Sequence, residues 1–214
     1  MTRERPILFS APMVRAILAG TKTQTRRAMR QQPPEGVQDF ATFHNPRGDG
    51  LAHFAFDPVA RELQEWFAVC PYGQPGDRIW VREAWKHIEG GPVYDAAGGV
   101  ADSFDPETIY RASRPKYPGP WKPSIHMPRW ASRINLEITG VRLERLQDIS
   151  EDDARAEGAR ECDPVSGREV LLAGPSQRGS FVLHYRDIWE QINGPGSWEA
   201  NPWVWVVEFK RVTS

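Results

Sequence analysis

The chain has 214 residues and a formal net charge of −1, and 40% of its residues are hydrophobic, which is enough to bury the core of one large domain or of a small domain with insertions. It has no run of about 18 apolar residues and no apolar N-terminal signal, so we expect a cytoplasmic protein without a membrane span. Its two cysteines, Cys70 and Cys162, exclude a disulfide framework and form no CxxC pair, so no zinc site is predicted.

The small net charge hides two basic blocks. Residues 1–30 carry seven Lys or Arg and one acid, and residues 111–133 carry six Lys or Arg and no acid. The rest of the chain is therefore strongly acidic. Two basic blocks on an acidic body indicate an anionic ligand on one face, unless the charges scatter and cancel in three dimensions.

The N-terminal region predicts a strand, a helix and a second strand. Residues 6–9 are an apolar run typical of a short strand. Ser10 can cap a helix that has Pro12 in its first turn, and Gly20 can end it. The apolar residues of this helix recur at helical spacing: Met13, Val14, Ile17 and Leu18. The polar segment 21–27 predicts a turn and a strand.

Two long stretches of the first half show no clear period. Residues 31–57, rich in Pro, Gly, Asn and Asp, predict a loop insertion, and residues 58–68 predict a short helix. Residues 71–77 (PYGQPGD) are a strong turn signal, and residues 78–85 alternate as a strand does. Residues 86–108 again predict a loop.

Residues 111–133 combine the second basic block with five prolines and with three aromatic residues, Tyr117, Trp121 and Trp130. So many prolines exclude an α-helix, and we expect this segment to run extended over the surface. Residues 133–146 are the longest predicted strand. Its apolar parity switches at Thr139-Gly140, which indicates a β-bulge.

The C-terminal region predicts two helices. Ser150 can cap a short acidic helix over residues 151–157, which Gly158 ends. A loop is expected at 159–176. The apolar positions of a longer amphipathic helix follow, before a stop at Asn193-Gly194: Phe181, Tyr185, Ile188 and Ile192.

The last strand, residues 203–212, places four large apolar residues on one face: Trp203, Trp205, Val207 and Phe209. Strands dominate the predicted elements and lie far apart in the chain. This pattern predicts an α+β fold, a small mixed β-barrel with flanking helices and loop insertions. The chain shows no internal repeat and no clean domain boundary.

Four segments, in order along the chain, resemble the ASCH family. Residues 17–26 (ILAGTKTQTR) resemble the family signature, a helix that ends in Gly and is followed by Lys-Thr-x-Thr. Residues 75–79 (PGDRI) resemble its Gly-Asp turn into a strand. Residues 154–158 (ARAEG) resemble its short helix with a glutamate, and residues 206–210 (VVEFK) its closing strand. The whole chain is similar to the larger ASCH-like proteins of phage and prophage genomes.

The resemblance implies a PUA-like β-barrel with a cleft between barrel and helices. It implies a single domain over residues 1–214, with insertions at about 31–70 and 86–130. Some small ASCH relatives are amidohydrolases that remove acyl groups from N4-acylated cytidine, and others are described as RNA-binding proteins or ribonucleases. Fold analogy does not choose among these activities.

The deacylating relatives use a Lys, a Thr three residues later and a distant Glu, which the resemblance places at Lys22, Thr25 and Glu157. Thr25 would be the nucleophile and Lys22 the base, while Glu157 would orient Lys22 or relay a proton to the leaving amine. Lys22 and Thr25 can meet only if the chain turns after Gly20. Lys22→Ala is expected to leave stability nearly unchanged. The alternative is that all three are ordinary solvated or strand residues.

Ten further residues are candidates for contacts with a nucleic acid. Their Arg, Lys and His side chains would contact phosphates or base edges, and their Trp side chains would stack on bases. They are Arg26, Arg27, Arg82, Trp85, Arg111, Trp121, Lys122, His126, Arg129 and Trp130. The alternative is that Trp85 belongs to the core and that the tryptophans of 111–133 pin down a Pro-rich loop.

We therefore expect a protein that binds RNA or a modified nucleoside in a cleft lined by Lys22, Thr25 and Glu157. The second hypothesis is an amidohydrolase that acts on N4-acetylcytidine-type nucleosides, and the third is a ribonuclease. The sequence shows no carboxylate cluster that would hold a divalent ion, so any cleavage would be metal-independent. No metal and no cofactor are predicted.

Overall fold

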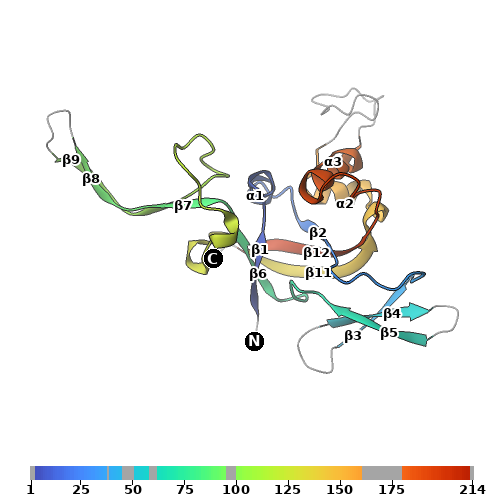
Figure 1. Cartoon of the computed structure of the whole chain (residues 1–214). Helices are drawn as coiled ribbons and strands as arrows, with labels where there is room; N and C mark the ends of the chain where they lie inside the picture. Colours follow the sequence, from blue (N-terminus) through green and yellow to red (C-terminus); the bar gives the residue numbers. More distant parts are fainter. Residues whose placement is uncertain are drawn as a thin grey trace.

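The computed structural model describes residues 3–37, 39–44, 51–57, 62–94, 100–160 and 180–212 (Figure 1). The fold is mixed α+β, with most of its regular structure in sheets and few helices, as the sequence predicts. No helix in these ranges is long and apolar enough to cross a membrane. Most of the expected loop at 159–176, with Cys162, lies outside the described residues.

A five-stranded sheet forms the centre of the fold. Its strands lie in the order β1 (Glu4–Leu8), β6 (Arg78–Arg82), β11 (Asn135–Arg145), β12 (Trp203–Val212) and β2 (Gln24–Ala28). The β1–β6 pair is parallel and the other pairs are antiparallel. β1 and β2 are the two edges, so the described strands do not close into the barrel that the sequence predicts. The remaining strands pair in separate small sheets instead.

Both faces of β12 are buried, which explains its nearly continuous apolar sequence. The predicted face, with Trp203, Trp205, Val207 and Phe209, packs in one core with α1 (Ala11–Leu18). Val204 and Val206 point the other way, into a second core with α3 (Phe181–Asn193). Figure 1 shows edge strand β2 between α1 and α3, where the candidate site lies.

Helix α1 begins and ends where the sequence predicts, and it buries Val14 and Ile17. Ser10 is its N-terminal cap by position, but the Ser10 side chain makes no capping hydrogen bond, contrary to expectation. Gly20 follows the helix with φ of 75°, a left-handed conformation that glycine adopts without a steric penalty. The chain therefore turns at Gly20, as the candidate site requires.

The two C-terminal helices also match their predicted positions. In α2 (Glu151–Ala156), the Ser150 Oγ accepts a hydrogen bond from the Asp153 N–H, and the acidic first turn complements the helix dipole. In α3 the buried residues are Tyr185 and Trp189, whereas Ile192 is 50% exposed. Ile192 therefore does not belong to the buried stripe that the sequence predicts.

The predicted β-bulge is present in β11. The register of β11 against β12 shifts between Ile138 and Gly140. Leu136 and Ile138 before the bulge, and Val141 and Leu143 after it, all pack against the same core. The extra residue therefore keeps the apolar side chains on one face of the sheet although their parity in the sequence changes.

The loop expected at 31–57 and the helix expected at 58–68 are wrong. Most of this region forms a three-stranded antiparallel sheet of β3 (Asp39–His44), β4 (Leu51–Asp57) and β5 (Glu62–Val69). One phenylalanine from each strand, Phe43, Phe54 and Phe67, meets its neighbour on one face of this sheet. Cross-strand contacts of this kind stabilise the strands, and they join residues too far apart in the chain to be predicted from a local sequence period.

The loop expected at 86–108 is also wrong. β7 (Trp85–Ile88) pairs with β10 (Glu107–Tyr110), and β8 (Gly91–Tyr94) pairs with β9 (Val100–Phe104). Figure 1 shows these strands as an arm that leaves the central sheet.

The predicted strand 78–85 is divided between β6 and β7, with a break at Glu83 and Ala84. Glu83 is 1% exposed, and both of its carboxylate oxygens accept hydrogen bonds from Arg133. A buried charge needs such a partner. The strand is interrupted at Glu83, whose side chain is buried against Arg133.

The segment 111–133 contains no α-helix, as predicted. It holds two short 3₁₀ turns, Ser124–His126 and Arg129–Ala131. It is not simply laid over the surface, because Met127 and Ala131 are 0% and 2% exposed and pack around Trp85 in a small third core.

Candidate functional site

A small cleft lies over the open edge of β2, between α1 and α3. Its volume is about 40 Å³, which is room for one or a few water molecules. The residues that line it include Met13 of α1, Thr25 and Arg26 of β2, Glu157 at the end of α2, and Tyr185 and Ile192 of α3. Two of the three residues expected in the site, Thr25 and Glu157, thus lie in its wall.

The backbone of β2 also faces this cleft. Hydrogen bonds at Thr23 and Met29 join odd-numbered residues to β12. Residues of an antiparallel strand alternate between facing their partner and facing away from it. The main-chain N–H and C=O groups of Arg26 and Ala28 therefore point away from β12, toward the open edge.

Lys22 lies behind the cleft wall, with a side chain that is 0% exposed. Its Nζ donates to Glu157 Oε2 at 2.6 Å, to the Glu157 carbonyl at 2.9 Å and to the Gln24 carbonyl at 2.8 Å. Three oxygens thus satisfy all three N–H donors of an ammonium group. This arrangement contradicts the expectation that Lys22→Ala leaves stability unchanged, because it would leave a buried carboxylate without its cation.

Two turns place Lys22 against Glu157. After Gly20, the Thr23 N–H donates to the Ala156 carbonyl, and Lys22 and Glu157 form an antiparallel bridge. Gly158 has φ of 85°, and a Cβ there would lie 3.0 Å from the Cβ of Ala16. A glycine is therefore required both by the backbone conformation and by the close approach of α1.

Arg26 is also fully buried and lies among three carboxylates. Its Nη2 is 2.8 Å from Glu144 Oε2 and 3.0 Å from Asp153 Oδ2, and its Nη1 is 3.6 Å from Glu157 Oε1. Arg142 joins the same network through Glu144 and Asp153. Buried ion pairs are a poor source of stability, so a network of this kind beside a cleft indicates a functional site.

Among the described residues, three polar atoms of Arg26 and Glu157 have no hydrogen-bond partner: Nε and Nη1 of Arg26 and Oε1 of Glu157. Nη1 and Oε1 face each other as an ion pair at 3.6 Å, beyond hydrogen-bond distance. An unpaired buried polar atom costs about 1–3 kcal/mol, so few persist in folded proteins. A group that presents an acceptor to Arg26 and a donor to Glu157 would satisfy them. This pattern is the most specific chemical feature of the site.

Thr25 is 1% exposed and faces the side of β2 opposite to Arg26. It lines the cleft, but in the described structure no hydrogen bond joins it to Lys22 or to Glu157. The structure therefore brings Lys22 and Glu157 into direct contact, and it brings Thr25 into the same cleft without a bond to either of them.

Burial shifts the pKa values of two groups around the cleft. Desolvation lowers the pKa of Lys22, and the carboxylate of Glu157 offsets part of that effect. The three acceptors around Nζ nevertheless favour the ammonium form. Burial raises the pKa of Tyr185 well above its ordinary value, and the charge of Glu157 acts in the same direction. The Tyr185 hydroxyl therefore stays neutral.

Several arginines expected to contact a nucleic acid have structural partners. Arg26 is buried and cannot reach a phosphate backbone, which corrects that expectation. Arg27 and Arg82 each donate to a main-chain carbonyl, and Arg129 forms an ion pair with Glu4 at 3.0 Å. These side chains hold segments of the protein together.

Trp85 is 4% exposed, so the expectation that it stacks on a base is wrong and its assignment to the core is right. Trp130 is 65% exposed, and its ring meets the edges of Trp85 and His87. The Lys122 Nζ lies 4.8 Å from the centroid of the Trp85 ring. Trp130 is thus the ring in this part of the surface that is available for stacking.

Residues 111–133 are called the basic segment below. Its remaining candidates, Arg111, Lys122 and His126, are exposed, and Trp121 is half-buried against Tyr117. Figure 1 shows α1 between this segment and the helices α2 and α3. The basic segment and the cleft therefore lie on different sides of α1.

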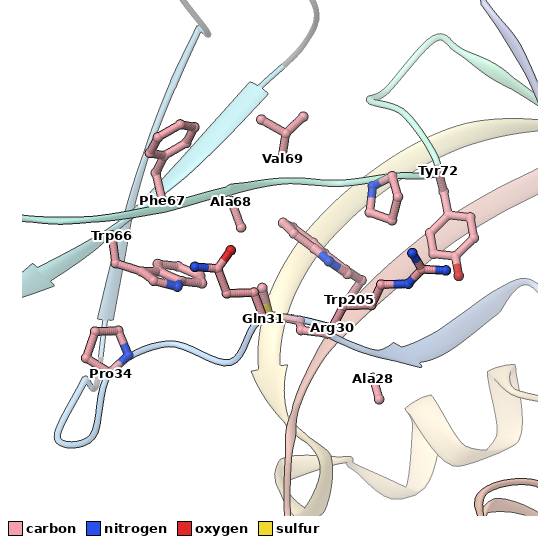
Figure 2. Close-up of a pocket in the computed structure, with 12 residues that line it drawn as sticks. Ala28, Arg30, Gln31, Pro34, Trp66, Phe67, Ala68, Val69, Tyr72 and Trp205 are labelled. Carbon is pink, nitrogen blue, oxygen red and sulfur yellow. The ribbon is translucent and has the colours of Figure 1, made fainter.

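Sequence reasoning missed a much larger cavity, of about 1020 Å³ (Figure 2). It lies between β5 and the segment that follows β2. Its walls include four aromatic residues and two polar ones: Trp66, Phe67, Tyr72, Trp205, Arg30 and Gln31. Half of the aromatic residues come from the stretch expected to be a helix, so its sequence pattern gave no signal of the cavity.

The described residues include no group of three or more His, Cys, Asp or Glu side chains that could hold a metal ion. Comparison of the chain with family models, with curated proteins and with solved structures gave no match.

Proposed function

We propose that the cleft at the edge of β2 binds a nucleobase, from RNA or from a modified nucleoside, as the resemblance to ASCH and PUA-like proteins implies. The observation that carries this proposal is the set of unpaired atoms on Arg26 and Glu157. These atoms offer two donors and one acceptor to a group that enters the cleft. The outward-facing backbone of Arg26 and Ala28 adds further donors and acceptors at the rim.

The donor and acceptor pattern selects among the bases. Cytosine and adenine each carry an exocyclic amino donor beside a ring acceptor. Such an edge can donate to Glu157 Oε1 and accept from Arg26, and glutamate is a known partner of the cytosine amino group. Uracil in the orientation of cytosine would present its O4 carbonyl oxygen to the carboxylate of Glu157, which is unfavourable, and it could offer a donor only by turning so that its N3–H faces Glu157. We therefore expect the cleft to favour the exocyclic amino group of cytosine or adenine.

The size of the cleft sets a condition on binding. Its volume of about 40 Å³ is far below the roughly 300–1,000 Å³ of a usual ligand site. A base can enter only if side chains at the rim move. Ile192 is half exposed on the last turn of α3, so its side chain can move without loss of core packing.

Deacylation of an N4-acylated cytidine is a second candidate function, and the position of Thr25 favours it. Thr25 is among the residues that line the cleft in which Glu157 would hold the base. In this structure all three Lys22 protons are engaged, so Lys22 can act as a base only after it passes one proton to Glu157 Oε2, 2.6 Å away. Lys22 could then accept the proton of Thr25 as its oxygen attacks the acyl carbon. The bond between that carbon and N4 would break as N4 takes up a proton from Lys22, and water would hydrolyse the resulting Thr25 ester.

Calorimetric titration with cytidine and uridine tests the binding proposal. We expect cytidine to bind at least about fivefold more tightly than uridine, because one unsatisfied buried polar group costs about 1 kcal/mol or more. Ile192→Trp should block the cleft and abolish cytidine binding. Gln191→Trp is the matched control, because Gln191 is exposed on the same turn and does not line the cleft. Equal affinity for both nucleosides, or full cytidine binding by Ile192→Trp, contradicts the proposal.

A further inference from the structure

The large cavity has the dimensions and the walls of a ligand site. Its volume, about 1020 Å³, lies at the upper end of the usual range for such sites. Figure 2 shows Trp66 and Ala68 on one side of β5 and Phe67 and Val69 on the other, so the cavity follows the open edge of this strand. β5 is an edge strand of its three-stranded sheet.

The chemistry of these walls suits a flat group that carries hydrogen-bond acceptors and a negative charge. The Nε1 donor of Trp66 is buried and has no hydrogen-bond partner among the residues that the structure describes. Among the described residues that line the cavity, Arg30 is the one with a charge, and Gln31 adds an amide that can read a base edge. The half-buried rings of Trp66 and Tyr72 offer surfaces on which a base can stack.

The cavity and the small cleft meet at β2. Ala28, the last residue of β2, lines both of them. Arg27 lines the cleft just before Ala28, and Arg30 lines the cavity just after it. The Arg27 side chain is engaged with the Leu8 carbonyl, so Arg30 is the cationic side chain that a phosphate would meet where a nucleic-acid strand passes from one space to the other.

We propose that the large cavity binds the nucleotide next to the one held in the cleft, so that the ligand is a single strand of at least two nucleotides that crosses the end of β2 at Ala28. This inference rests on the proposed function, since the cleft must hold one of the two bases. The cavity holds the flanking base against Trp66 and Tyr72, and Arg30 binds the phosphate between the two nucleosides.

Titration with cytidine and with the dinucleoside monophosphates CpA and ApC tests the inference, with tryptophan fluorescence and calorimetry as readouts. We expect one of the two dinucleotides to bind at least about tenfold more tightly than cytidine, because a stacked base and a bound phosphate add to the contacts in the cleft. The preferred order of the two nucleosides reports the direction of the strand across β2.

Two variants of the cavity separate its contribution from that of the cleft. Trp66→Phe keeps a ring against Phe40 but removes the Nε1 donor, and Arg30→Ala changes an exposed side chain that cannot compromise folding. Each should remove most of the gain of the dinucleotide and leave the affinity for cytidine unchanged. Arg211→Ala is the matched control, since it removes an exposed charge six residues beyond Trp205 on β12 and should change neither affinity.

The outcomes distinguish the two proposals. If cytidine binds in the cleft and neither dinucleotide binds more tightly, the flanking site is refuted and the proposed function stands. If Trp66→Phe weakens the affinity for a dinucleotide and Ile192→Trp does not, the cavity binds nucleotides without the cleft. That result would refute both the proposed function and the proposal that the ligand crosses β2.

Discussion

The Nζ of Lys22 lies 2.6 Å from Oε2 of Glu157, although 135 residues separate them in the chain. The main chains of the two residues also form an antiparallel bridge, and Lys22 donates to the Glu157 carbonyl. The segment that leads into β2 is therefore fixed to the end of α2. This contact positions Glu157 in the cleft beside Arg26.

A double-mutant cycle measures this contact. Glu157→Gln should lower the free energy of unfolding by about 3 kcal/mol, because it leaves the buried ammonium of Lys22 without a counter-charge. Lys22→Met should cost a similar amount for the converse reason. The double variant should be less destabilised than the sum of the single variants, by 1 kcal/mol or more. Urea unfolding measures all four proteins, and strictly additive losses would show that the pair is not coupled.

Acid should weaken the network around Arg26. Burial alone would raise the pKa of Asp153, but Arg26, Gln24 and Arg142 together outweigh it and hold that pKa below its ordinary value of 3.8. The charged carboxylate therefore contributes stability above pH 3.8, and this contribution is lost as pH falls from there through the lower pKa of the folded protein.

Asp153→Asn should consequently reduce stability at neutral pH and flatten its pH dependence below about pH 4. Chemical unfolding between about pH 2 and pH 7 measures both effects. Asp152→Asn is the matched control, because the side chain of Asp152 is 91% exposed in the same helix. A pH profile of Asp153→Asn that coincides with that of the control would contradict the prediction.

Two glycine substitutions separate backbone strain from crowding at the site. Gly20 and Gly158 both have a positive φ, but a Cβ at Gly20 meets nothing within 4 Å, whereas one at Gly158 lies 3.0 Å from Ala16 and 3.4 Å from Lys22. Gly20→Ala should cost about 1–2 kcal/mol from its left-handed conformation alone. Gly158→Ala should cost at least about 1 kcal/mol more, since the neighbouring side chains must also shift. Equal losses of thermal stability in the two variants would mean that α1 moves away from the added Cβ at Gly158 without an energetic cost.

Deacylation makes a separate prediction about Thr25. Incubation with N4-acetylcytidine should release cytidine, which chromatography detects. Thr25→Val keeps the shape of the side chain but lacks the nucleophile, so the rate should fall by on the order of 10³-fold or more. Thr25→Ser should keep measurable activity. Absence of turnover by the wild-type protein would refute the second candidate function and leave the binding proposal intact.

The exposed part of the basic segment should bind single-stranded RNA with a marked dependence on salt. Lys122→Ala should flatten the slope of log K against log salt by about 0.7, the contribution of one phosphate. Arg129→Ala should flatten it less, because Glu4 already pairs with Arg129. Trp130→Ala should weaken binding by about 1–3 kcal/mol without a change of slope, because stacking releases no counterions. Equal slopes for all four proteins would show that these charges do not contact phosphates.

The elements that the sequence predicted correctly are those whose pattern is local. The alternation of β12, the parity switch of β11 and the glycines after α1 and α2 each occupy a short window of sequence, and each is present in the structure. The apolar face of a strand and the glycine that ends a helix are both set by residues that are neighbours along the chain.

The sheet of β3, β4 and β5, the open edge at β2, the burial of Lys22 and Arg26 and the large cavity were decided by the tertiary structure alone. Each depends on contacts between segments far apart in the chain, such as Lys22 with Glu157 or the β5 edge with the residues after β2. A sequence pattern reports which residues can be buried, but the partner that pairs a strand or neutralises a charge is chosen only when distant segments pack together.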